Sequence, residues 1–216
     1  MNSGWWTIGR WHGTPIRLHW SVALSALLFS RFQFEPAFWA GFVLLILIHE
    51  FGHAFLVRRY RLTVLEIAVH GLGGYCAHAP ARTREQTAVI AWGGVLAQAL
   101  ALAVVQIAVT VGGPPRSEAM WQLYYVFTVT NWLMILINLL PIGPLDGAKA
   151  WPLIGMLWRR GQAAAAARRQ ARDRHRPEKH GLRAIAGGEK SGDEQEEARK
   201  LVRELLDRTG KSRPDA

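Results

Sequence analysis

Hydrophobic residues dominate the chain up to about residue 158, and polar residues dominate the remainder. Several apolar runs in the first part are longer than an ordinary soluble domain carries. Four of them are candidate transmembrane segments, at residues 16–34, 38–57, 87–111 and 121–140. The pattern predicts an all-α polytopic membrane protein with about four transmembrane helices. Residues 1–158 form its membrane-embedded domain, and residues 159–216 form a basic, partly helical cytosolic tail.

The segment between the second and third predicted spans has a different pattern. Residues 63–69 are β-branched and partly alternating, Gly71, Gly73 and Gly74 follow, and residues 75–78 come next. This pattern predicts a short β-hairpin after the second span. Irregular backbone is not tolerated against lipid, so the hairpin must pack on protein or line a cavity.

The two ends of the chain lack long apolar runs. The first fifteen residues are rich in Trp and Gly, which suits a segment at the membrane interface. In the tail, a basic segment over residues 168–179 and a loop over 187–192 precede residues 191–208. There, early acidic residues and an apolar stripe predict a solvated helix.

Charge indicates the orientation in the membrane. The net charge of +10 would suggest nucleic acid in a soluble protein. Here the basic residues flank the apolar spans or lie in the tail, so the anionic cytoplasmic leaflet is the expected counterpart and nucleic acid is not. Clusters at 58–61, 82–84 and from 159 onward predict a multi-pass protein of the cell (inner) membrane with both termini cytoplasmic.

The second span contains an H-E-x-x-H pattern, His49-Glu50-Phe51-Gly52-His53. On a helix, residues i and i+4 stand on one face, so both imidazoles can reach the same metal ion. A lone His on an apolar helix is usually a satisfied core residue. Two His and one Glu at membrane depth are unfavourable unless they pair or bind something. Glu50 stands beside the metal position and suits a general base acting on a water molecule that the metal activates.

A third ligand is expected from the end of the fourth span. Two prolines break the helix there, and Asp146 follows at the depth and on the side predicted for the histidines. A carboxylate completes a zinc site with two His, although an Asp-Gly pair is also typical of a turn. His70 and His78 are better explained as solvated interfacial residues. Gln98, in the third span, is equally explained by a bond to a neighbouring helix or by a role in the site.

Two motifs of this chain together resemble those of the site-2 protease family of intramembrane zinc metalloproteases. The first is His49-Glu50-Phe51-Gly52-His53, and the second is Asn138-Leu139-Leu140-Pro141 with Leu145-Asp146-Gly147. The resemblance covers most of residues 12–150. It implies one Zn²⁺ held by His49, His53 and Asp146, with Glu50 as catalytic base. It also implies that Asn138 orients substrate or stabilises the oxyanion. The family often has Gly-Pro-x-x-Asn in the third span; here Gly94-Val95 precedes Gln98, whose amide could keep a polar contact to substrate or oxyanion.

The expected function is hydrolysis of peptide bonds in or near transmembrane segments of membrane proteins. The resemblance implies regulated intramembrane proteolysis, with a membrane-bound transcription regulator as a typical substrate. A helical substrate must unwind, and an edge strand over residues 63–69 could pair with the extended segment. The alternatives are a membrane zinc protease acting on cytoplasmic-face or lipidated substrates, and a non-catalytic metal-binding membrane protein. Glu50 argues against the latter, which needs no base.

Overall fold

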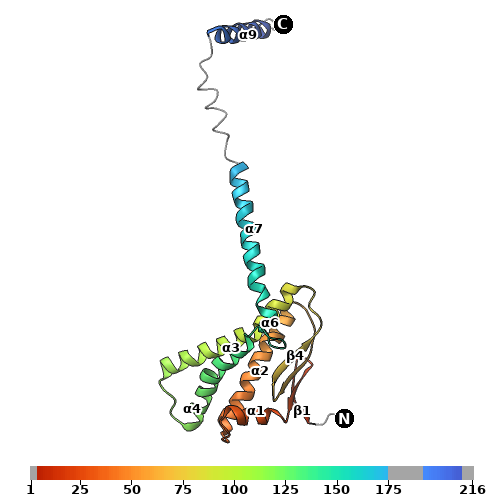
Figure 1. Cartoon of the computed structure of the whole chain (residues 1–216), viewed down its shortest axis with the longest axis vertical. Coiled ribbons are helices and arrows are strands. Elements are labelled where there is room, and N and C mark those ends of the chain that lie inside the picture. The colour runs from red at the N-terminus through yellow and green to blue at the C-terminus, as the bar shows by residue number, and fades with distance from the viewer. Residues whose placement is uncertain (1–3, 175–191, 211–216) are drawn as a thin grey trace, which may run out of the picture. The chain divides into compact units, whose positions relative to one another are not determined.

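The computed structural model describes residues 4–174 and 192–210 (Figure 1). The chain divides into two compact units, Met1–Arg160 and Gly161–Ala216. The first unit begins with β1 (Trp5–Trp11), β2 (Thr14–His19), α1 (Val22–Phe29), α2 (Pro36–Arg59), β3 (Val64–His70) and β4 (Gly73–His78). It continues with α3 (Arg84–Gly112), α4 (Glu118–Tyr125), the π-helical turn η1 (Val126–Thr130), α5 (Asn131–Asn138) and α6 (Gly147–Ala150). Helix α7 (Pro152–Arg174) starts in this unit, and α9 (Gly192–Gly210) lies in the second.

Among the described residues, three helices are long and apolar enough to cross a membrane. They are α2, α3 and the continuous helix formed by α4, η1 and α5. The predicted spans at residues 38–57, 87–111 and 121–140 fall on these helices, so three predicted helices of membrane length are confirmed. Local sequence fixes their ends. Pro36 begins α2, and the Thr83 side chain caps α3 by accepting a hydrogen bond from the Gln86 amide, at 3.1 Å.

The prediction of a transmembrane helix over residues 16–34 is wrong. These residues contain most of β2 and the eight-residue helix α1, which at about 12 Å is too short to cross a bilayer. Hydropathy suggested one helix here because it does not show that β2, at the start of this segment, pairs with β1 and β3.

The four strands form one sheet in the order β1-β2-β3-β4, beside α2 (Figure 1). The predicted hairpin is confirmed as the antiparallel pair β3 and β4, whereas the pairing of β1 with β2 was not predicted. Strand β2 runs parallel to β3, which therefore has a neighbour on both sides. The prediction that residues 63–69 form an edge strand is accordingly wrong, and β1 and β4 are the two edge strands.

The core of the first unit lies between α2 and the elements around it. Ile67 of β3 packs with Ala54 and Val57 of α2, and Val69 packs in the cluster that contains Phe38 and Phe42. All of these side chains are essentially buried. The sheet thus turns its apolar face to α2. This places β4 beside α2, the helix that carries the H-E-x-x-H pattern.

Helices α2 and α3 approach each other closely at a pair of glycines. A Cβ atom at Gly52 would lie 2.2 Å from the carbonyl oxygen of Gly93, and one at Gly93 would lie 2.6 Å from that of Gly52. No larger residue fits at either position without moving a helix. Small residues on both helices therefore allow α2 and α3 to pack closely.

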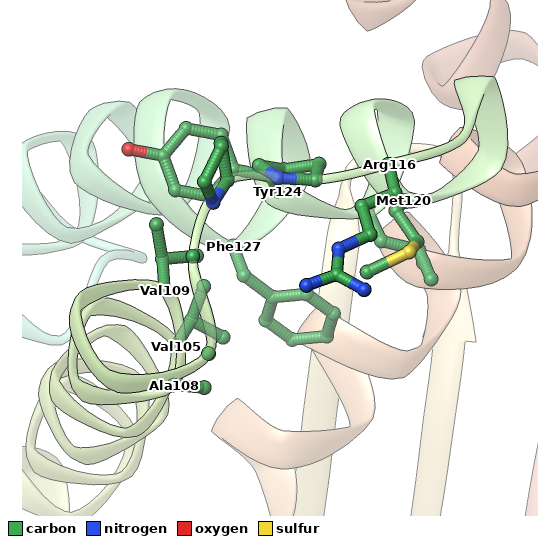
Figure 2. A pocket seen from close by; sticks show the side chains of 12 residues that line it. Val105, Ala108, Val109, Arg116, Met120, Tyr124 and Phe127 are labelled. Atoms are coloured by element: carbon green, nitrogen blue, oxygen red, sulfur yellow. The ribbon is translucent and has the colours of Figure 1, made fainter.

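A cavity of about 580 Å³ lies between the C-terminal half of α3 and the start of α4 (Figure 2). Val105, Val109 and Phe127 supply apolar walls, and Arg116 and Tyr124 supply polar groups. None of its lining residues comes from the H-E-x-x-H motif or from the loop that carries Asp146. The cavity is therefore separate from the predicted metal site.

The second unit contains helix α9, which confirms the helix predicted over residues 191–208. Leu201, Val202, Leu205 and Leu206 lie at helical spacing and are each more than half exposed. The part of the predicted basic segment beyond residue 174, and most of the predicted loop over 187–192, lie outside the described residues.

Candidate metal centre

Helix α2 places the three polar residues of the H-E-x-x-H motif in the protein interior. The exposed fractions of His49, Glu50 and His53 are 5%, 3% and 7%. One helical turn separates the two imidazoles, and their Nε2 atoms lie 3.0 Å apart. Both metal-binding nitrogens therefore point to the same place, as the spacing predicts.

Asp146 meets this pair although 93 residues separate it from His53. Its Oδ2 atom lies 2.9 Å from Nε2 of His49 and 3.1 Å from Nε2 of His53. Burial raises the pKa of Asp146, but the hydrogen bonds and charges of the two histidines outweigh burial and hold that pKa well below its ordinary value. The side chain is thus a carboxylate at neutral pH, the form that binds metals.

Contacts with the rest of the protein hold the loop that carries Asp146. Gly147 sits so close to the carbonyl oxygens of Leu139 and Leu140 that an added Cβ would lie 2.4 Å from each. The indole of Trp151 donates to the Leu139 oxygen at 2.7 Å, and the indole of Trp92 donates to the Ala150 oxygen at 3.0 Å. The loop is therefore anchored both to the end of α5 and to α3.

The three ligand atoms fit a zinc ion. Atoms bound to one tetrahedral zinc at about 2.0–2.1 Å stand roughly 3.3 Å from one another. The separations of 2.9, 3.0 and 3.1 Å need to widen by only a few tenths of an ångström. Two imidazoles and one carboxylate are also a usual donor set for catalytic zinc, with a fourth position left open. Among the described residues, this is the one group of three or more such side chains that could hold a metal.

The Nδ1 atom of each imidazole, on the ring edge away from Nε2, also has a hydrogen-bond partner. Nδ1 of His49 donates to the side-chain oxygen of Gln98 at 2.9 Å, and Nδ1 of His53 donates to the main-chain oxygen of Ile90 at 2.7 Å. A proton on Nδ1 leaves the Nε2 lone pair free for a metal, so we assign this tautomer to both residues in the zinc-bound centre.

Glu50 lies outside the ligand triad and against strand β4. An added Cβ at Gly74 would come within 2.5 Å of its Oε1 atom, so only glycine lets the strand approach the carboxylate this closely. Burial, and then the charge of Glu50, raise the pKa of the neighbouring Cys76 thiol to about 12. Cys76 therefore stays a neutral thiol beside Glu50 at neutral pH.

Gly94 is the glycine on which the metal centre depends most. A Cβ at this position would lie 2.4 Å from Cε1 of His49 and 2.6 Å from Nε2 of His53. We expect Gly94→Ala to displace both imidazoles and weaken zinc binding at least about tenfold, as loss of ligand orientation does. Competition with a chromophoric chelator measures this affinity. Gly112→Ala, also on α3 but with open space around its Cβ, is the matched control, and equal affinities for the two variants would contradict the prediction.

The other residues considered for the site lie outside the triad of His49, His53 and Asp146. Asn138 ends α5, half-buried, and its side chain has no hydrogen-bond partner within the described part of the chain. Gln98 lies behind His49, on the edge of the ring away from Nε2. The His70 ring lies edge-on to Trp5 and tilted against Tyr75 on the sheet, and Nδ1 of His78 donates to the oxygen of Ala79. Neither of these two histidines joins the triad.

Sequence reasoning missed Gly74, Gly94 and Asn131. Asn131 follows the turn η1, is fully buried, and donates from Nδ2 to the main-chain oxygen of Gln98 at 2.9 Å. Its position in a membrane-length segment, where a buried amide needs partners, was the available signal. The two glycines carried no separate signal, because their importance depends on which residues the fold places opposite them.

Two buried histidines on a membrane-length helix, with Glu50 beside them and Asp146 from the loop after α5, form a candidate metal site of the H-E-x-x-H type. No family model matches the chain. A putative zinc metalloprotease, Rip3 of Mycobacterium tuberculosis (in strains Erdman and H37Rv), is 30% identical over 174 residues. That match covers 71% of this chain and 44% of Rip3, so the chain spans less than half the length of this relative.

Comparison with solved structures shows a shared fold. The site-2 protease of Methanocaldococcus jannaschii superposes with a TM-score of 0.54 at 20% identity, over 69% of this chain and 71% of that one. The sequence relative and the shared fold together confirm the resemblance to the site-2 protease family that the two motifs indicate.

Proposed function

We propose that this chain is an intramembrane zinc metalloprotease, a hydrolase that cuts peptide bonds in or near transmembrane segments of membrane proteins. The observation that carries the proposal is the convergence of His49, His53 and Asp146 beside Glu50 on a membrane-length helix. The likeness to Rip3 and to a site-2 protease supports it.

In this proposal His49, His53 and Asp146 hold one Zn²⁺. When bound, zinc supplies polarisation of the scissile carbonyl and lowers the pKa of a water molecule. Glu50 accepts the proton of the attacking water and passes it to the leaving nitrogen. Asn138, half-buried with an unused amide at the end of α5, orients the substrate chain or donates to the oxyanion.

Strand β4 offers a place for the substrate backbone. It is one of the two edge strands of the sheet, and its Gly74 lies against the Glu50 side chain. A substrate segment that has unwound from its helix can add to this edge by main-chain hydrogen bonds, which orders it beside the catalytic base. We therefore assign substrate pairing to β4. The class of substrate we propose is a single-span membrane protein, such as a membrane-bound transcription regulator.

The proposed orientation places the tail over residues 159–216 in the cytoplasm. The cytoplasmic N-terminus expected from four spans is not carried forward, because residues 16–34 do not form a transmembrane helix. Basic residues at the end of α2 and at the start of α3 support it, because such clusters favour the cytoplasmic side. In a Cys76→Ala background, an impermeant maleimide added to intact cells should label Ser117→Cys. It should label Arg59→Cys and Arg160→Cys only after permeabilisation. Labelling of the two arginine positions from outside, with position 117 protected, would reverse the topology.

The function itself is tested by the protein fragments that membranes release. Cells carrying the wild type are compared with cells carrying Glu50→Gln at equal abundance in the membrane. We expect one or more membrane proteins to yield soluble fragments, ending in or near a transmembrane segment, in the wild type alone. Identical fragment sets from the two strains would overturn the proposal.

A further inference from the structure

Gln98 is a fully buried amide in the middle of a membrane-length helix. Its exposed fraction is 0%, and its oxygen accepts the hydrogen bond from Nδ1 of His49 at 2.9 Å. Its side-chain nitrogen has no hydrogen-bond partner within the described part of the chain. The contact with His49 is thus the one hydrogen bond of this side chain, and a buried amide with a single bond is unfavourable unless that bond has a role.

The chemistry of a metal-binding imidazole explains the contact. A neutral imidazole that offers Nε2 to a metal carries its proton on Nδ1, and this proton needs an acceptor in a buried site. For His53 the acceptor is the main-chain oxygen of Ile90, which no side-chain substitution removes. For His49 it is the side chain of Gln98 alone. The orientation of one ligand is therefore set by the backbone, and that of the other by one replaceable amide.

The surroundings hold Gln98 in place. Asn131, itself fully buried, donates from Nδ2 to the main-chain oxygen of Gln98 at 2.9 Å and to that of Phe127 at 3.3 Å. Asn131 follows the π-helical turn η1, which occurs in the middle of the third membrane helix. Such turns are frequent near functional sites, because they shift side chains out of the ordinary helical register. The third membrane helix is thereby tied to α3 at the level of Gln98, the residue that contacts His49.

We propose that Gln98 is a positioning residue that fixes the tautomer and ring orientation of His49 and thereby sets the affinity of the centre for its metal. The Gln98 amide meets the ring edge away from Nε2, so it faces neither the metal position nor a substrate bound there. This role rests on the proposed zinc centre and replaces the substrate or oxyanion contact expected for this position.

Near-isosteric variants of Gln98 separate hydrogen bonding from packing. Gln98→Met keeps the length of the side chain and removes the acceptor, whereas Gln98→Glu keeps an acceptor. Gln106→Met, at an exposed position of the same helix, is the matched control. The purified full-length variants are compared by Zn²⁺ affinity, by the visible spectrum of the Co²⁺-substituted protein, and by the melting temperature of the metal-free form.

We expect Gln98→Met to bind Zn²⁺ about 10- to 100-fold more weakly and to change the Co²⁺ spectrum, as loss of an outer-shell partner does. Gln98→Glu should stay within about threefold of the wild type, because a carboxylate also accepts from Nδ1. Gln106→Met should match the wild type. The metal-free melting temperatures of the wild type and Gln98→Met should agree within a few degrees.

Two results would overturn the positioning role. One is wild-type zinc affinity and an unchanged Co²⁺ spectrum in Gln98→Met. The other is an equal loss of affinity in Gln98→Met and Gln98→Glu, which would show that Gln98 acts through packing. Neither measurement uses a substrate, so the outcome is separate from that for the protease. A wild-type chain that binds no zinc at all would instead remove the proposed function.

Discussion

Glu50→Gln is expected to bind zinc with wild-type affinity and to lose peptide-bond cleavage. The substitution leaves the three ligands and their shape unchanged, but an amide cannot accept the proton of the attacking water. General-base catalysis contributes about 10²–10⁴ in rate, which corresponds to roughly 3–5 kcal/mol of transition-state stabilisation. Single-turnover cleavage of a membrane substrate by the purified variant, read together with its zinc content, measures the effect.

The control for this variant is Glu118→Gln, which makes the same chemical change in the first turn of α4, at an exposed position. It should keep both zinc and activity. Glu50→Gln cleaving at a rate near that of the wild type would show that another group acts as the base.

Asp146→Ala is expected to lose zinc, and with it all activity, while inserting into the membrane normally. Its carboxylate oxygen lies about equally close to both histidines, at 2.9 and 3.1 Å, so its removal takes away one of three ligands. Because loss of an outer-shell partner alone weakens binding about 10- to 100-fold, loss of a ligand should exceed about a hundredfold. Asp146→Asn should behave similarly, since a neutral amide oxygen is a poorer zinc ligand than a carboxylate.

Metal analysis of the purified variant, beside its activity and its abundance in the membrane, tests this prediction. Arg116→Ala is a suitable control, because that residue lies by the cavity between α3 and α4, apart from the triad. An Asp146→Ala protein that is fully loaded with zinc and active would require a third ligand from elsewhere in the chain.

The sequence predicts the parts of this fold that depend on local pattern. The apolar runs over 38–57, 87–111 and 121–140 coincide with helices because their length and composition suit the bilayer without reference to other residues. Residues 16–34 were mispredicted because hydropathy does not show that β2 pairs with both β1 and β3. The same reason explains why β1 was missed and β3 was expected at an edge.

Some features of the candidate site also follow from local sequence, whereas others depend on how the helices pack. The convergence of His49 and His53 follows from the period of a helix, and no knowledge of the fold is needed. The meeting of Asp146 with this pair was inferred from depth and side alone, and the structure places it there. The contact between Gln98 and His49 depends on the register of α2 against α3, which Gly52 and Gly93 set by close approach. No sequence spacing reveals that register.

The central claim is that a single protein-bound zinc ion lets this chain hydrolyse a peptide bond within a bilayer. The direct measurement uses purified wild type and Glu50→Gln, reconstituted in liposomes with a single-span substrate, and mass spectrometry of the products. We expect one or more cuts in or near the substrate's transmembrane segment by the wild type only. Cleavage should stop when a chelator removes zinc and return when one equivalent is restored. Products that persist unchanged after zinc removal, or that form equally with Glu50→Gln, would contradict the account.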